Sequence, residues 1–262
     1  MIKFIKYAGT KIKYVDIINR EINKSNATTY VEPFFGSGAV FFNLEKSFDK
    51  YIINDLDRNV ITIVNAFKNS DYTLFEACVD EVKERFGDIK KDKEAYYNFR
   101  NNFNKYVWNT NTIAEGFYLY ILYNSCINSM ARFGPNGFNQ SYGNRLRVLN
   151  ETEFNNIKNK LENTEIYNLD FFDFKNNIPT NSLLFLDPPY FERQTKNYNI
   201  INEEWYNNFI EYCKNSNNDI LYTDVDHDNL NWDKITIRER MQNISPNRRD
   251  EYTIKEVMFK NF

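Results

Sequence analysis

A run of four residues, Asp187, Pro188, Pro189 and Tyr190, combines a carboxylate, a stiff backbone and an aromatic ring. Pro189 lacks an N–H group and fixes its own φ, and it forces Pro188 into an extended conformation. The chain therefore holds the Asp187 carboxylate, the Pro188 carbonyl and the Tyr190 ring in one arrangement. Two acceptors beside a flat ring suit an exocyclic amino group on a planar base, which would donate to both oxygens and stack on Tyr190.

The element that must position these groups is the apolar run Ser-Leu-Leu-Phe-Leu at residues 182–186. A run of this length predicts a strand that is buried on both faces. Four residues are a short motif, however. A strand followed by a Pro-Pro turn with a helix-capping aspartate is therefore the alternative interpretation.

A glycine-bearing loop follows a second expected strand at residues 28–31, and we expect it to lead into a helix. Glycines in this place let a ligand approach the backbone at a helix N-terminus. The third glycine of the dinucleotide pattern is missing, which suits an adenosyl ligand without a pyrophosphate. The residues of this loop are Glu32, Pro33, Phe34, Phe35, Gly36, Ser37, Gly38, Ala39, Val40 and Phe41.

Asp55 follows the strand expected at residues 51–53. It comes about 20 residues after the glycine loop, where a ribose-binding carboxylate lies in such folds. Its alternative role is to cap the helix expected at 57–67. Asp170 could likewise accept from an adenine amino group while Phe171 packs on the ring, or be an ordinary loop acid.

The stretch at residues 128–147 differs from its surroundings, because it is rich in Gly and Asn and carries three arginines without an acid. Pro135, Asn136 and Gly137 have the chemistry of a hairpin turn. Arginine pairs with guanine, and asparagine or glutamine with adenine, in the major groove. This stretch is the best local candidate for contacting nucleic acid, and a solvated surface hairpin is the alternative.

The 262 residues are enough for one α/β domain with an inserted subdomain, and 42% hydrophobic and 17% aromatic content suffices for a core. Aromatic faces on the helices expected at 74–86, 94–106 and 113–126 are interpreted as core. The formal charge of -3 restricts any nucleic-acid contact to a local basic patch.

Three widely spaced cysteines give neither a metal site nor a disulfide framework. His227 lies among Asp224, Asp226 and Asp228, a group that is more typical of solvated surface than of a metal site. We therefore expect no metal. Without a signal peptide or an apolar run of membrane-spanning length, we expect a cytoplasmic protein that contacts no membrane.

Five stretches, in this order and spacing, resemble the Dam-type DNA adenine-N6 methyltransferases of the alpha group. They are Lys6-Tyr7-Ala8-Gly9-Thr10-Lys11, the loop from Glu32 to Phe41, Asn54-Asp55, the hairpin from Arg132 to Arg145, and Asp187-Pro188-Pro189-Tyr190. Tyr7 and Thr10 stand where the family has Trp and Gly. Gln140-Ser141 stands where the family has a small residue followed by proline.

The resemblance implies a Rossmann-like methyltransferase sheet with helices on both faces and an inserted, mainly helical recognition domain with a β-hairpin. The catalytic domain would comprise residues 1–56 and 150–262, and the recognition domain residues 57–149. The implied reaction is methyl transfer from S-adenosylmethionine to N6 of an adenine that is flipped out of double-stranded DNA. GATC is the leading candidate for the recognised sequence, and a partner restriction nuclease stays unassigned.

The resemblance also implies a role for each matched residue. The catalytic residues would be Asp187, Pro188, Pro189 and Tyr190. The cofactor-binding residues would be Tyr7, Ala8, Gly9, Lys11, Glu32, Pro33, Phe34, Gly36, Ser37, Gly38, Ala39, Asp55, Asp170, Phe171 and Asp187. The DNA-binding residues would be Asn128, Arg132, Asn139, Tyr142 and Arg145, with Arg132 making a base contact.

Three alternatives stay open at this point. The same chemistry could act on N4 of cytosine or on adenine in RNA. A non-catalytic DNA-binding protein could keep the fold, although both motifs are intact here. A Rossmann oxidoreductase is disfavoured by the missing third glycine and by the Pro-Pro-Tyr sequence.

Overall fold

The computed structural model describes residues 1–127, 132–191, 201–245 and 248–262. Its main element is a seven-stranded sheet in the order β5-β2-β1-β6-β7-β9-β8. The strands are β1 (Thr29–Glu32), β2 (Lys50–Asn54), β5 (Thr164–Tyr167), β6 (Ser182–Leu186), β7 (Asp219–Val225), β8 (Asp233–Ser245) and β9 (Arg248–Lys260). β1 pairs in parallel with β2 and β6, and β6 with β7, whereas β9 is antiparallel to β7 and β8.

The central strands form because most of their residues are apolar or aromatic and can be buried on both faces of the sheet. Every residue of β1 and of β6 is buried. In the register of this pair, Tyr30 lies opposite Leu183 and Val31 opposite Leu184. The strand predicted at residues 182–186 is confirmed at both ends. The mixed, mostly parallel sheet with helices confirms the predicted fold class.

Most of the helices begin after a residue whose side chain caps the N-terminus. The helices predicted at 57–67, 74–86, 94–106 and 113–126 begin within two residues of these bounds. The caps are Asp57, Asp71, Asp92, Thr112, Asn150 and Asn202. The helices are α1 (Val15–Ile22), α2 (Arg58–Lys68), α3 (Tyr72–Phe86), α4 (Lys93–Tyr106), α5 (Ile113–Ser125), α6 (Glu151–Glu162), α7 (Phe171–Phe174) and α8 (Glu203–Asn215).

One prediction about the helices is wrong. The glycine loop does not lead into an α-helix but into a single 3-10 turn, Phe41–Asn43. Gly36 and Gly38 both adopt positive φ, at +50° and +65°, so the backbone turns twice before this segment begins. The short helix α7, which is followed by a 3-10 turn at Lys175–Asn177, was not predicted.

The chain divides into two compact units. The first unit comprises Met1–Val15, Phe35–Leu44 and Asn54–Asp170, and it holds α2 to α6 and a small hairpin. The second unit comprises Asp16–Phe34, Glu45–Ile53 and Phe171–Phe262, and it holds most of the sheet with α1, α7 and α8. The predicted division into residues 1–56 with 150–262 and residues 57–149 stays a prediction.

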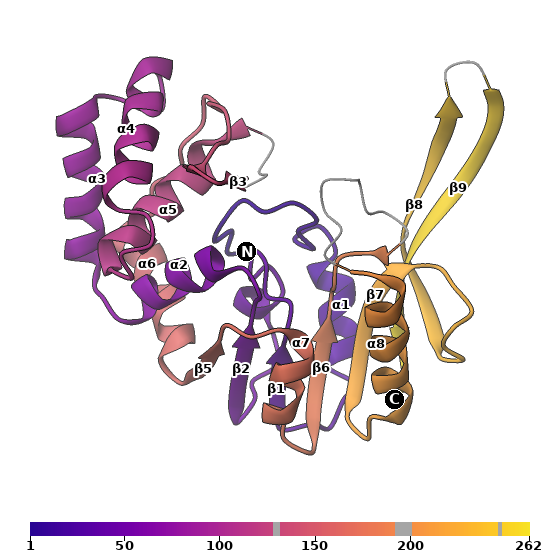
Figure 1. Ribbon diagram of the computed structural model, residues 1–262. Helices are drawn as coiled ribbons and strands as arrows, with labels where there is room; N and C mark the ends of the chain where they lie inside the picture. The colour runs from indigo at the N-terminus through magenta and orange to yellow at the C-terminus, as the bar shows by residue number, and fades with distance from the viewer. Residues whose placement is uncertain (128–131, 192–200, 246–247) are drawn as a thin grey trace. The chain divides into compact units, whose positions relative to one another are not determined.

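Aromatic rings form the core of the first unit. Phe67, Phe75 and Phe154 lie 4.9–5.6 Å apart between ring centroids. Phe67 also contacts Phe117 and Tyr120. These side chains come from α2, α3, α5 and α6, whose grouping is visible in Figure 1. The interpretation of the aromatic faces as core is therefore confirmed.

Gly116 lets α5 lie close to α2 in this core. A Cβ atom on Gly116 would lie 2.4 Å from the Ala66 Cβ and 2.6 Å from the Thr62 carbonyl oxygen. Neither neighbour is the end of a flexible side chain. The packing therefore requires glycine in the middle of a helix, although glycine lowers intrinsic helix stability by roughly 1 kcal/mol.

We expect Gly116→Ala to destabilise the protein despite the better helix propensity of alanine. The added methyl must push α5 away from α2, and such overpacking costs about 1–3 kcal/mol. Urea unfolding at equilibrium measures the effect. Asn101→Ala, at an exposed position in α4, is the control for helix propensity alone. A Gly116→Ala protein at least as stable as wild type would contradict the close-packing argument.

Candidate active site

Asp187 follows the last residue of β6 and belongs to the second unit. Its side chain is half-buried, Pro188 is buried, Pro189 is exposed and Tyr190 is half-buried. The hydroxyl of Thr223 in β7 donates a hydrogen bond of 2.6 Å to Oδ1 of Asp187. The alternative in which Asp187 caps a helix finds no support, since residues 188–190 are not helical.

Thr223 is a contact that the sequence reading missed. It lies within β7 and carries no motif of its own. The available signal is that β7 is the next parallel strand beyond β6 and that both run to the same edge of the sheet. The pairing itself depends on register, which puts Tyr222 opposite Leu186.

Glu32 and Pro33, which end and follow β1 in the same unit, are both buried. The Tyr30 hydroxyl donates to Oε2 of Glu32 at 2.7 Å. Burial, together with the neighbouring Glu32 carboxylate, raises the pKa of Tyr30 well above its usual value. Glu32 is therefore held in place by a tyrosine that stays protonated.

Phe34 and Phe171 stack on each other with centroids 5.3 Å apart and planes 21° apart. Phe171 is buried and Phe34 is half-buried. Trp205 of α8 is 6.2 Å from Phe34 and 6.1 Å from Phe171, and it was not among the predicted residues. The two predicted cofactor contacts thus belong to one aromatic cluster of the second unit.

Asp55 holds the glycine loop within the first unit. Its Oδ2 accepts a hydrogen bond of 2.6 Å from the Gly36 N–H, and its Oδ1 accepts one of 2.8 Å from the Asp57 N–H. Burial raises the pKa of Asp55 to about 7, although both hydrogen bonds act in the opposite direction. The alternative role of Asp55 as a helix cap is wrong, because the cap of α2 is Asp57.

The N-terminal loop and the glycine loop are joined in the first unit. The hydroxyls of Thr10 and Ser37 lie 2.9 Å apart, and buried Lys11 donates to the Gly9 carbonyl at 3.2 Å. A Cβ atom on Gly36 would lie 3.3 Å from the Tyr7 ring, whereas one on Gly9 would meet nothing within 4 Å. Gly9 therefore leaves open space beside its backbone.

Three further residues predicted to bind the cofactor, Ala8, Ala39 and Asp170, also lie in the first unit. Ala8 is exposed, Ala39 is buried and Asp170 is half-buried at the end of the first unit. Nearby, Asn54 exchanges hydrogen bonds of 3.0 and 2.9 Å with the backbone of Leu169. The Asn54 amide thereby fixes the segment that leads to Asp170, a role that the sequence does not predict.

The predicted hairpin exists, with β3 (Phe133–Gly134) antiparallel to β4 (Gly137–Phe138). Asn104 of α4 binds the backbone of Phe138 twice, at 2.8 and 2.9 Å. The Trp108 ring stacks on Phe133 at 5.9 Å. The hairpin is therefore fixed to the helices of the first unit.

Three of the predicted DNA-binding residues, Arg132, Asn139 and Arg145, are exposed. The hydroxyl of half-buried Tyr142 donates to the Lys90 carbonyl at 2.7 Å, so this group fixes the hairpin in place. Asn128 lies outside the described residues.

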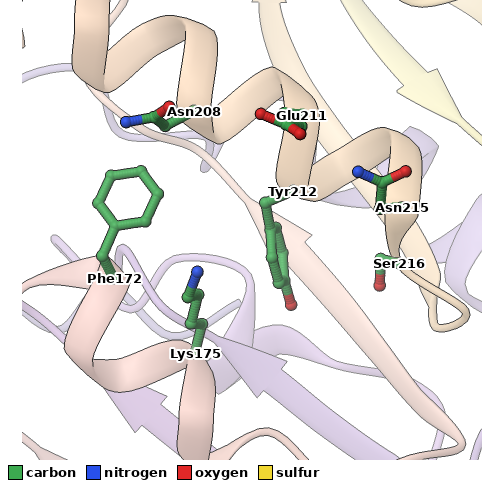
Figure 2. Close-up of a pocket in the computed structure, with 7 residues that line it drawn as sticks. All are labelled: Phe172, Lys175, Asn208, Glu211, Tyr212, Asn215 and Ser216. Atoms are coloured by element: carbon green, nitrogen blue, oxygen red, sulfur yellow. The ribbon is translucent and has the colours of Figure 1, made fainter.

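A surface pocket of the second unit lies between α8 and the segment of α7 with its 3-10 turn (Figure 2). Phe172, Lys175 and Tyr212 line it together with polar side chains of α8. It contains none of the residues predicted for the active site.

The described residues contain no group of three His, Cys, Asp or Glu side chains that could hold a metal ion. His227 instead stacks on Phe259 with centroids 4.4 Å apart, and burial lowers its pKa. Over the same described ranges, no helix has the length and apolar character needed to cross a membrane.

A Rossmann-like sheet with Asp-Pro-Pro-Tyr after a central strand defines a methyltransferase-type protein. A family model described as D12 class N6 adenine-specific DNA methyltransferase matches residues 7–245. The chain belongs to this family. The predicted resemblance and enzyme class are thereby confirmed, adenine in DNA is the family's substrate, and the oxidoreductase alternative is excluded.

Two curated relatives agree with this assignment. The type II methyltransferase M.MjaIII of Methanocaldococcus jannaschii is 30% identical over 198 residues, which cover 71% of this chain and 68% of the relative. The DNA adenine methylase of Escherichia coli K12 is 29% identical over 189 residues, covering 71% and 64%. The chain thus spans about two thirds of the length of these relatives.

Among solved structures, the rRNA methyltransferase aviRa of Streptomyces viridochromogenes aligns with 97% of this chain and 86% of its own chain. The identity is 12% and the TM-score is 0.39. A similarity at this level adds nothing to the assignment.

We expect the ionisation of Asp55 to lower stability as the pH rises. The folded pKa of about 7 exceeds the value of 3.8 for an isolated aspartate, so the folded state binds the proton more tightly. Its stabilising contribution is complete below about pH 4 and is lost as the pH rises through 7. Asp55→Asn cannot ionise and lacks this dependence.

Urea unfolding of both proteins at about pH 5 and about pH 8 measures this effect, since the pH slope reports the difference in bound protons. The wild type should lose more stability over this interval than Asp55→Asn. The other titrating groups contribute equally to the pH slopes of both proteins. A constant loss of stability caused by the asparagine amide does not change the slope. The difference between the two slopes therefore reports Asp55 alone. Equal slopes would show that Asp55 keeps an ordinary pKa in the folded chain.

Proposed function

We propose that this chain transfers a methyl group from S-adenosylmethionine to N6 of an adenine that is flipped out of duplex DNA. The single observation that supports this best is the Asp-Pro-Pro-Tyr sequence after a buried parallel strand, in a chain of the N6-adenine family. Extrusion of the base costs a few kcal/mol and exposes an amino group that is otherwise inside the stack.

The cofactor-facing residues of the first unit fit a nucleoside ligand. Asp55 presents a carboxylate, Thr10 and Ser37 present hydroxyls, and Gly9 leaves room for close approach to the backbone. The resemblance also assigns Glu32, Phe34 and Phe171 of the second unit to cofactor binding. When bound, S-adenosylmethionine supplies an electrophilic methyl group on a sulfonium centre.

Asp187 and the Pro188 carbonyl would accept the two N6 hydrogens, and Tyr190 would stack on the base. These hydrogen bonds turn the nitrogen lone pair out of conjugation with the ring and toward the methyl group. As the nitrogen gains positive charge, the Asp187 carboxylate stabilises it at the place where the charge develops. One N6 proton then leaves to Asp187 or to water, and no covalent enzyme intermediate is required.

Transfer of tritiated methyl groups to unmethylated duplex DNA, followed by nucleoside analysis and site mapping, tests the proposal. N6-methyladenine at one short sequence is the expected product, and GATC is the sequence that we propose. Tritium in N4-methylcytosine would show that cytosine is the substrate instead of adenine. Tritium in RNA but not in DNA would show that the substrate is RNA. Binding of the cofactor without any transfer would favour a non-catalytic DNA-binding protein.

We expect Asp187→Ala to lower the methyl-transfer rate by at least about a hundredfold, the scale for removing one preorganised group at a developing charge. Binding of S-adenosylmethionine should persist at least in part, because Asp55 and the glycine loop are unchanged. Calorimetric titration and single-turnover transfer separate the two quantities. Asp173→Ala, which removes an exposed acid of α7 in the same unit, is the matched control. Normal turnover of Asp187→Ala would refute the assignment.

We expect Arg132→Ala to weaken sequence discrimination. A bidentate arginine–base contact is worth about 1–3 kcal/mol, or roughly 5-fold to 150-fold. kcat/KM should fall by this factor on the recognised sequence and by less on sequences that differ at one base pair. Arg20→Ala, at an exposed position of α1, controls for loss of positive charge. A uniform loss on all sequences would indicate a phosphate contact instead.

A further inference from the structure

The two residues after Asp187 offer its carboxylate no backbone N–H group. An aspartate side chain in a turn commonly accepts a hydrogen bond from the backbone N–H two residues further along the chain. Here that residue is Pro189, and the intervening residue is Pro188, so neither offers an N–H group. The two prolines fix the backbone but leave the rotation of the carboxylate to be set from elsewhere.

Thr223 sets this rotation in the structure. Its hydroxyl lies 2.6 Å from Oδ1 of Asp187, whereas its distance to the Leu186 carbonyl is 3.4 Å. A hydroxyl–oxygen distance of 2.6 Å is typical of a strong bond to a charged acceptor. Asp187 is thus the main acceptor for this hydroxyl.

The donor is held on a rigid element. Thr223 is fully buried, and β7 pairs with β6 on one side and with β9 on the other, where Thr223 lies opposite Met258. The β-branched side chain has few allowed rotamers. A group that is fixed in this way can hold a neighbouring side chain to the narrow angular range that catalysis requires.

We propose that Thr223 is a positioning residue for methyl transfer: its hydroxyl fixes the Asp187 carboxylate in the orientation that accepts an N6 hydrogen. The inference rests on the proposed function of Asp187. Thr223 contributes no atom to the reaction and no contact to the base. Its loss should therefore slow the chemical step and leave the binding of both substrates intact.

The decisive comparison is between Thr223→Val, which keeps the shape and removes the hydroxyl, and Thr223→Ser, which keeps the hydroxyl. A hydrogen bond to a charged group contributes about 1.5–3 kcal/mol, so the single-turnover rate constant of Thr223→Val should fall about 10-fold to 150-fold. Thr223→Ser should stay within about threefold of wild type. The Kd values for S-adenosylmethionine and for duplex DNA should be unchanged in both.

Ser182→Ala is the matched control. It removes a buried hydroxyl from the opposite end of β6, where the partner is the Pro179 carbonyl at 2.8 Å. This variant tests whether any lost hydroxyl in these strands slows transfer, and it should retain the wild-type rate constant. A rate loss in Ser182→Ala equal to that in Thr223→Val would overturn the specific role of Thr223.

Two further results would overturn the inference. One is a wild-type rate constant for Thr223→Val, and the other is a loss in Thr223→Ser as large as in Thr223→Val. If Thr223→Val does not fold, Thr223→Ala supplies the second hydroxyl-free variant with the same expected outcomes. Failure of the proposed function itself looks different, since Asp187→Ala would then retain turnover. An inactive Asp187→Ala with a fully active Thr223→Val refutes only the positioning role.

Discussion

Parallel pairing of four buried strands is the constraint from which the proposed chemistry follows. β2, β1, β6 and β7 are paired in one direction, so their carboxyl ends lie at one edge of the sheet. Backbone groups inside this sheet are paired and most of its side chains are apolar, so the polar groups that can serve a ligand gather where the strands stop. Glu32, Asp187 and Asp224 all lie at that edge in the second unit.

The second requirement is that the groups of the site are held rigidly. The two units of the chain achieve this in different ways. In the second unit, two prolines fix the backbone after β6 and a threonine of a central strand fixes the carboxylate. In the first unit, the buried Asp55 accepts hydrogen bonds from the Gly36 N–H of the glycine loop and from the Asp57 N–H before α2. The first arrangement orients a side chain for a reaction, whereas the second shapes a backbone for binding.

Sequence patterns predicted the elements whose causes are local. The apolar run at residues 182–186 and the hairpin turn at Pro135-Asn136 each depend on neighbouring residues, whereas the cap of α2 is Asp57 and not Asp55. The fold class followed from the family resemblance. The helix expected after Gly38 failed for a reason that is also physical: successive positive φ values at Gly36 and Gly38 redirect the chain, and only a 3-10 turn follows.

The contacts that the sequence could not provide are those that join distant segments. Thr223 meets Asp187 across 36 positions because the β6–β7 register places Tyr222 opposite Leu186, and a shift by one residue would turn the hydroxyl to the other face. Asp55 meets Gly36 across 19 positions in the same way. Motifs therefore identify the groups that can act, whereas strand register decides which other groups orient them. A variant that shifts the β6–β7 register would lose the orientation of the Asp187 carboxylate, although its sequence would still contain every motif residue.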